Sequence, residues 1–169
     1  MGNFYDYYRA TDRHAAVAKP HVPRAVEQSM RGHPVFDAVD AKWIDPEFNL
    51  GQLIACIRGV PYAADLVKTI ALYPPPEHAP VTDEEWDALP EDSPYLDGPG
   101  IDELSAEVRD ALADVPDDHL PVLGARWAQV VNFVSPPDPG DMAALVTELR
   151  DLAQRARSAD QQLYCWMSA

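Results

Sequence analysis

The chain lacks several features that commonly identify a function. It has two cysteines in 169 residues, Cys56 and Cys165, and neither belongs to a Cys-x-x-Cys motif. Two thiols cannot complete a zinc site, so we expect buried structural cysteines in a reducing compartment. No apolar run approaches the roughly 18 residues of a membrane span, and the N-terminus lacks the basic start and apolar centre of a secretory signal. These absences predict a soluble cytoplasmic protein.

Recognisable catalytic motifs are also missing. There is no Gly-Lys-Ser/Thr phosphate loop, no GxGxxG, no GxSxG and no HExxH. The acidic segments lack EF-hand spacing, and His14, His21 and His33 follow no metal-ligand pattern. The sequence therefore predicts no metal and no cofactor. It leaves open whether the protein is an enzyme.

Basic residues are scarce in the C-terminal part of the chain. The formal net charge is −15, from 28 Asp and Glu against 13 Lys and Arg. The first 68 residues hold eight acids and eight bases, whereas the other 101 hold 20 acids and five bases. Arg109 is the only Lys or Arg between Glu77 and Asp118. Such a field repels nucleic acid and anionic lipid and attracts cationic groups. We expect a basic protein partner, and no nucleic-acid or membrane binding.

Apolar spacing and capping residues predict the main elements. The aromatic-rich segment 4–8 and the apolar segment 163–167 predict strands at the two ends of the chain, which we expect to pair in one sheet. An apolar stripe between Asp45 and Gly59 predicts a helix, and an apolar segment follows at 61–73. Further helices are expected at 101–115, 117–131 and 138–157.

These elements predict one α+β domain over residues 1–169. It is rich in helices and has a small antiparallel sheet that joins the N-terminal and C-terminal strands. The four tryptophans all lie in apolar-patterned segments, so we expect them to anchor the core: Trp43, Trp86, Trp127 and Trp166.

The longest irregular stretch lies at about residues 74–100 and contains seven prolines. Thr82 and Glu85 match a capping box, which predicts about two turns of helix inside it. We expect an ordered or semi-ordered acidic loop that lies across the body. The first functional hypothesis is that this acidic half binds a basic partner, as immunity and inhibitor proteins do; a merely solvated acidic face is the alternative. The candidate contact residues are Glu84, Trp86, Asp87, Glu91, Asp92 and Tyr95.

A second cluster of polar and aromatic residues precedes the helix at 45–59. It comprises Asp37, Asp40, Lys42 and Trp43. Carboxylates beside an aromatic wall suit acid–base work or ligand binding, so the second hypothesis is a small-molecule-binding protein or an enzyme with its cleft here. The alternative is a packed tryptophan next to a helix cap, with the lysine on the surface.

The order of these pieces resembles the YfbM-like domain-of-unknown-function family. The matching segments are Met1-Gly2-Asn3-Phe4-Tyr5, Asp40-Ala41-Lys42-Trp43 before the helix that ends at Gly59, Ile101-Asp102-Glu103-Leu104-Ser105, and Leu163-Tyr164-Cys165-Trp166-Met167-Ser168. The resemblance covers most of the chain. It implies a fold and a cytoplasmic location, and it carries no activity.

Overall fold

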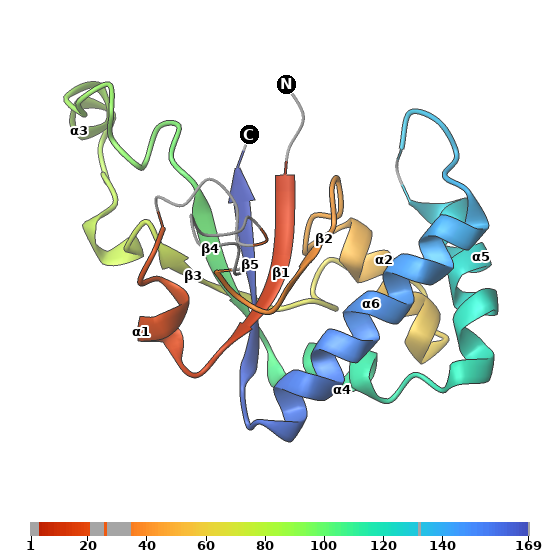
Figure 1. The fold of residues 1–169 in the computed structure, drawn as a ribbon. Helices are drawn as coiled ribbons and strands as arrows, with labels where there is room; N and C mark the ends of the chain where they lie inside the picture. Colours follow the sequence, from red (N-terminus) through yellow and green to blue (C-terminus); the bar gives the residue numbers. More distant parts are fainter. Residues whose placement is uncertain (1–3, 21–25, 27–34, 132, 169) are drawn as a thin grey trace.

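A five-stranded antiparallel sheet forms the centre of the molecule (Figure 1). The structure is a computed structural model that describes residues 4–20, 26, 35–131 and 133–168. The strand order is β2-β1-β5-β4-β3, with bounds Phe4–Ala10 (β1), Ala38–Asp40 (β2), Thr69–Tyr73 (β3), Gly100–Leu104 (β4) and Gln162–Ser168 (β5). The two terminal strands pair along their whole length, from Phe4 opposite Ser168 to Ala10 opposite Gln162. The predicted pairing of the chain ends is confirmed.

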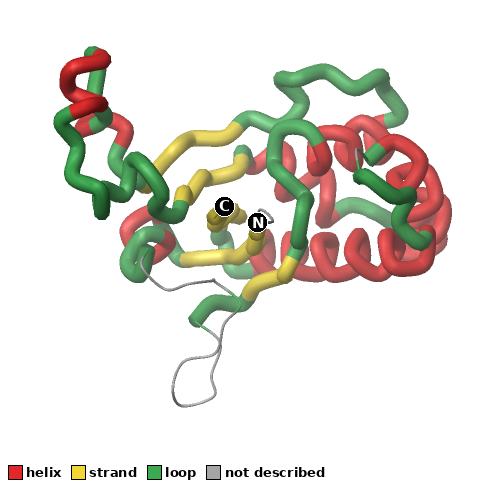
Figure 2. The backbone as a smooth tube through the Cα atoms, turned by 90° about the horizontal axis from the view of Figure 1, so that it is seen from above, coloured by secondary structure: helices red, strands yellow, loops and turns green. Residues whose placement is uncertain are grey.

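Helices make up most of the rest, and the predicted α+β class is confirmed. The described α-helices are Arg13–Ala16 (α1), Asn49–Arg58 (α2), Asp83–Asp87 (α3), Ala106–Ala113 (α4), Leu120–Val130 (α5) and Pro139–Ser158 (α6). Two short 3-10 helices are Pro76–His78 (η1) and Asp117–His119 (η2). Helices α2, α4, α5 and α6 gather on one side of the sheet (Figures 1 and 2). We call these four helices the helical half.

Both faces of the central strands are covered by apolar side chains. Successive residues of a strand point to opposite faces, so Tyr7 and Tyr8 enter different clusters. Tyr7 packs with the helical half, and its hydroxyl donates to the backbone oxygen of Ile44 at 2.7 Å. Tyr8 packs with Tyr164 and Trp166 on the other face, where its hydroxyl donates to the backbone oxygen of Ala16 in α1 at 2.8 Å. This explains why β5 is a continuous apolar run rather than an alternating one.

Local capping signals place the helix ends. Asp45 accepts from the backbone N–H of Phe48 at 2.6 Å, and Gly59 ends α2 in the left-handed conformation, with φ of 64°. Asp138 accepts from the backbone N–H of Gly140 at 2.7 Å and caps α6. The predicted helices at 45–59, 117–131 and 138–157 are confirmed, with ends shifted by a few residues.

The helical half is joined by one close contact and one buried hydrogen bond. A Cβ on Gly124 of α5 would lie 2.5 Å from the backbone nitrogen of Ala143 in α6, so only glycine permits this approach. The indole N–H of Trp127 donates to the backbone oxygen of Asn49 at 2.8 Å and ties α5 to α2. Trp127 is fully buried, as predicted.

Three expectations were wrong. Strands are not confined to the chain ends, because residues 69–73 and 100–104 form β3 and β4. The helix expected from Ile101 begins at Ala106, since Ile101 and Leu104 point from β4 into the core and pairing with two neighbouring strands overrides their helix-like spacing. Trp43 and Trp86 do not anchor the core, because 53% and 41% of their surfaces are exposed.

Candidate functional site

Residues 74–99, here called the acidic arm, connect β3 to β4 and project from the sheet. Figures 1 and 2 show α3 at the far end of this segment, away from the helical half. The predicted irregular segment at 74–100 is therefore present, but it does not lie across the body. The helix of about two turns that was expected inside it corresponds to α3, which spans five residues, Asp83–Asp87.

Hydrogen bonds within the acidic arm fix its shape. Thr82 accepts from the backbone N–H of Glu85 at 3.2 Å, and Glu85 accepts from those of Val81 at 2.7 Å and Thr82 at 3.1 Å. This is the predicted capping box. The same backbone donors lower the pKa of Glu85, so its carboxylate stays charged. At the base of the arm, the hydroxyl of Tyr95 donates to the backbone oxygen of Pro75 at 2.7 Å.

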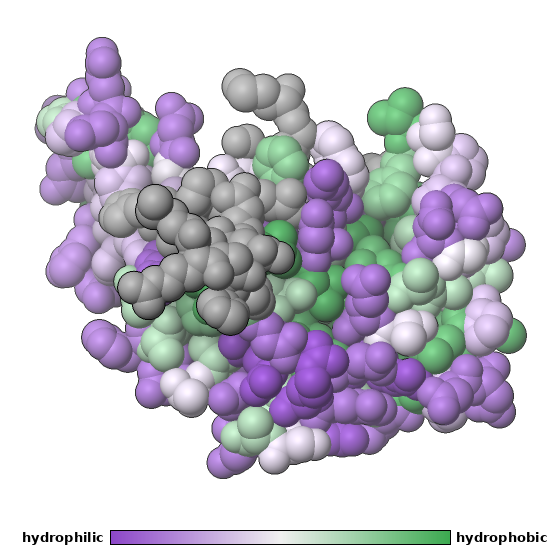
Figure 3. Space-filling model, in the orientation of Figure 1, coloured by the Kyte–Doolittle hydropathy of each residue, from purple (hydrophilic) through white to green (hydrophobic). Residues whose placement is uncertain are grey.

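The surface of the acidic arm carries exposed charge of one sign. Its acids are all exposed and no Lys or Arg lies among them: Glu77, Asp83, Glu84, Glu85, Asp87, Glu91, Asp92 and Asp97. Figure 3 shows this hydrophilic surface at the upper left of the molecule. Trp86 and Leu96 are 41% and 46% exposed, so apolar groups stand among the carboxylates. Of the predicted contact residues, Tyr95 alone is half-buried, and its hydrogen bond gives it a role in shaping the arm.

The second predicted cluster is dominated by an ion-paired carboxylate. Asp37 accepts from Arg155 of α6 through both oxygens at 2.8 Å and from Arg9 of β1 at 2.6 Å. The hydrogen bond from Arg155 is the main cause that lowers the pKa of Asp37 to about 2, with a further contribution from Arg9. Asp37 therefore ties the long helix α6 to strand β1.

The other members of that cluster lie along and beyond β2. Asp40 ends the strand opposite Asp6, and both Asp40 and Lys42 are exposed. Trp43 occupies a turn with φ of 70°, where its backbone oxygen accepts from the side-chain nitrogen of Asn49 at 2.7 Å. Asp37 precedes β2 whereas Lys42 and Trp43 follow it, and the cavities described next are lined by other residues. A cleft built by these four residues stays a prediction.

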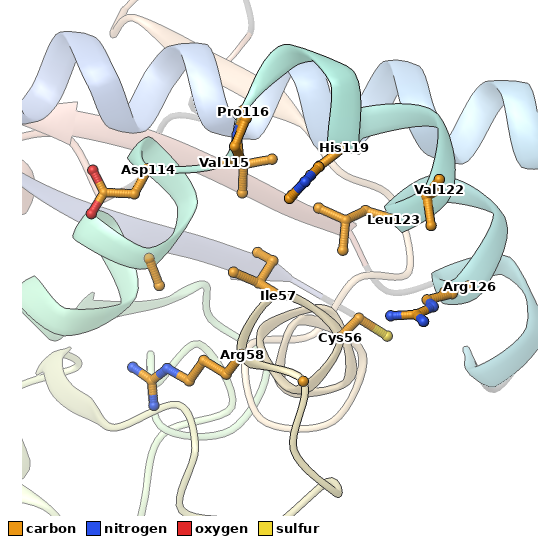
Figure 4. Close-up of a pocket in the computed structure, with 12 residues that line it drawn as sticks. Cys56, Ile57, Arg58, Asp114, Val115, Pro116, His119, Val122, Leu123 and Arg126 are labelled. Atoms are coloured by element: carbon orange, nitrogen blue, oxygen red, sulfur yellow. The ribbon is translucent and has the colours of Figure 1, made fainter.

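A cavity of about 680 Å³ opens between the C-terminal end of α2, the C-terminal end of α4 and the start of α5 (Figure 4). It is lined by Cys56, Ile57, Arg58, Gly59, Ala111, Asp114, Val115, Pro116, His119, Val122, Leu123 and Arg126. A second cavity of about 410 Å³ shares Cys56, Gly59 and Arg126 with it. This cavity was not predicted from the sequence. Four of its lining residues nevertheless follow helical spacing along α5 and the N-cap residue that precedes it: His119, Val122, Leu123 and Arg126.

The described residues, 4–20, 26, 35–131 and 133–168, offer neither a metal site nor a membrane-spanning helix. Among those residues, no group of three or more His, Cys, Asp and Glu side chains could hold a metal ion. His14 is exposed there, whereas His21 and His33 lie outside the described residues. No described helix is both long and apolar enough to cross a membrane.

Comparison of the chain with family models, with curated proteins and with solved structures found no match. The resemblance to the YfbM-like family therefore stays a prediction, and the functional argument depends on the geometry described above.

Proposed function

We propose that the protein is an interaction module whose acidic arm binds a basic protein partner, in the manner of an immunity or inhibitor protein. The observation that carries this proposal is the surface of the acidic arm. The acidic arm projects from the sheet and carries eight exposed carboxylates together with the exposed Trp86, and none of these carboxylates forms an ion pair with a described Lys or Arg.

The charge of the acidic arm favours fast association with a cationic surface. Clustered charges of one sign steer an oppositely charged partner and raise its association rate, and added salt weakens that attraction. Within the described residues, these carboxylates have no ion pair with Lys or Arg. A partner's cations would thus meet charges that no internal salt bridge neutralises.

Trp86 adds apolar contact area, which the charged side chains of the arm do not provide. Tryptophan is among the residues that contribute most to binding when an interface buries them, because its ring covers a large area with little loss of conformational freedom. Glu85 and Asp87 are the immediate sequence neighbours of Trp86 in α3, and Glu91 and Asp92 follow on the same arm. An exposed apolar side chain on a segment rich in exposed charges is the composition expected of a docking surface.

The state of the two cysteines supports a cytoplasmic location for this interaction. Cys56 and Cys165 are both free thiols in the structure. Burial raises the pKa of both, which keeps them protonated and poorly reactive. Unpaired thiols fit the reducing conditions of the cytoplasm.

The experiment compares two triple variants that remove the same charge from different places. The arm variant carries Asp87→Asn, Glu91→Gln and Asp92→Asn. It spares Glu85, so the capping box stays intact. The matched control carries Asp118→Asn, Asp141→Asn and Glu148→Gln, which are exposed acids of η2 and α6 without an ion pair to a described residue.

Each protein is used to capture partners from its own cytosol at about 0.05 M and about 0.5 M salt, with identification by mass spectrometry. We expect the native protein and the control to retain a cationic partner at low salt, and the arm variant and the high-salt samples to lose it. If both variants lost the partner equally, capture would depend on the net charge of the whole protein. If the arm variant captured as much partner as the native protein, the acidic arm would not be the binding surface.

A further inference from the structure

The arginines of the protein differ in whether a nearby carboxylate neutralises their charge. Among the arginines that the structure describes, six form ion pairs: Arg9 and Arg155 with Asp37, Arg13 with Glu103, Arg109 with Asp110, Arg150 with Asp117 and Asp151, and Arg157 with Asp114. The two without a carboxylate partner among the described residues are Arg58 and Arg126. Both line the same cavity of about 680 Å³.

Unpaired arginines are unexpected in a chain with 28 acids and 13 bases. Carboxylates are abundant in the chain, yet no described one forms an ion pair with either guanidinium. Asp114 is the one acid that lines the cavity, and it is already paired with Arg157, whose Nη1 lies 2.6 Å from its Oδ1. His119 adds a further donor to the lining. The polar part of the cavity is therefore cationic, although the protein as a whole is strongly anionic.

The rest of the lining is apolar. Ile57, Val115, Val122 and Leu123 supply the walls between the cationic groups (Figure 4). The volume lies within the roughly 300–1,000 Å³ that is typical of small-molecule sites. An apolar wall with a few charged groups suits a ligand that has an apolar body and a charged end, because the body is taken out of water while the charge keeps its hydrogen bonds.

Arg126 is the best placed of the cationic groups. It also borders the second cavity, and Figure 4 shows its side chain directed toward Cys56 across the space between α5 and α2. Burial raises the pKa of Cys56, with Arg126 opposing that rise, so the thiol stays neutral near pH 7 and does not neutralise the guanidinium. A guanidinium can bind a carboxylate or a phosphate through two parallel hydrogen bonds.

We propose that the cavity between α2, α4 and α5 binds a small organic anion, with an apolar body against Ile57 and Leu123 and a carboxylate or phosphate on Arg126. Arg58, from the other wall, adds to the positive potential. This site is distinct from the acidic arm, which lies at the opposite end of the molecule in Figures 1 and 2. It does not depend on the arm having a partner.

The test uses three probes with the same aromatic body: 1-naphthoate, 1-naphthyl phosphate and the uncharged 1-naphthamide. Their binding to the full chain is followed by ligand-observed nuclear magnetic resonance and by calorimetry. For ligands of this size we expect dissociation constants on the order of 1 mM or below for the anions. The amide should bind about tenfold more weakly, because it cannot form the charge-assisted pair. The anion that binds more tightly identifies the head group.

Two variants that each remove one positive charge locate the site. Arg126→Gln should weaken binding of both anions about tenfold and leave the amide unchanged. Lys42→Gln is the matched control, because Lys42 is also exposed and lies in the rival cluster near Trp43. Both variants are checked for unchanged circular dichroism and melting temperature. Equal affinity for the amide and naphthoate, equal losses in the two variants, or no anion binding at about 10 mM would overturn the proposal.

Discussion

The acidic arm and the helical half use the same residue types in opposite ways. Trp127 of α5 is fully buried and donates its indole N–H to Asn49, whereas Trp86 of the arm is 41% exposed. Carboxylates in the body hold elements together, as Asp37 does between β1 and α6, whereas those of the arm are exposed and form no ion pair with a described residue. The difference indicates that the sheet and the helical half supply most of the free energy of folding. The side chains of the arm contribute little to that stability, so they can be charged residues that suit a partner.

The largest expected difference between the two regions is the effect of replacing each tryptophan by alanine on the free energy of unfolding. Trp127→Ala removes a fully buried ring and its hydrogen bond to the backbone oxygen of Asn49, so we expect a loss of about 3–5 kcal/mol in the free energy of unfolding. Trp86→Ala should change it by less than about 0.5 kcal/mol. Urea denaturation followed by circular dichroism measures both. Similar losses of unfolding free energy in the two variants would mean that the arm unfolds together with the core and contributes to its stability.

A smaller effect is expected from the ion pairs of Asp37. Its pKa is depressed from 3.8 to about 2, so the charged carboxylate stabilises the fold at every pH above its unfolded value. That stability is lost as the pH falls from about 4 through about 2. Because about a third of the side chain is exposed and solvent screens the pairs, we expect Asp37→Asn to cost about 1–2 kcal/mol at pH 7.

The pH dependence of the unfolding free energy distinguishes a charge effect of Asp37 from a packing effect. The native protein and Asp37→Asn should converge in stability as the pH approaches 2, because the native carboxyl is then partly protonated. Unfolding midpoints in urea at several pH values between about 2 and 7 measure this convergence. A constant difference over that range would show that Asp37 acts through packing rather than charge.

The smallest effect on the whole protein is expected inside the arm. Thr82→Ala removes one half of the capping box and should weaken α3 by about 1 kcal/mol locally. The melting temperature of the protein should stay nearly constant, since α3 contributes no residue to either core cluster. Hydrogen exchange at the amide of Glu85 should become faster while that of Leu149 does not change. A global loss of stability would contradict the independence of the arm.

The sequence predicted elements whose signals are local. Asp45, Gly59 and Asp138 mark helix ends through hydrogen bonds and backbone angles within a few residues, and the capping box of Thr82 and Glu85 is equally local. The pairing of β1 with β5 could be predicted because an aromatic strand at each chain end needs a partner.

Elements defined by distant contacts were missed. Ile101 and Leu104 continue the helical spacing of the residues that follow, and only the pairing of β4 with β3 and β5 makes them part of a strand. The exposure of Trp86 depends on how the arm leaves the sheet, which its local sequence does not determine. The cavity brings α2 together with α4 and α5, which lie much further along the chain, so Cys56 and Arg126 do not form a recognisable motif.

The central claim is that the proposed basic partner binds to the acidic arm, whereas the stability of the fold comes from the rest of the molecule. The most direct measurement replaces residues 77–97 with a short Gly-Ser linker between β3 and β4. It then compares urea unfolding with partner capture at low salt. We expect a free energy of unfolding within about 1 kcal/mol of that of the native protein, and no capture of the basic partner. Unfolding of the variant, or capture that survives the replacement, would contradict the account.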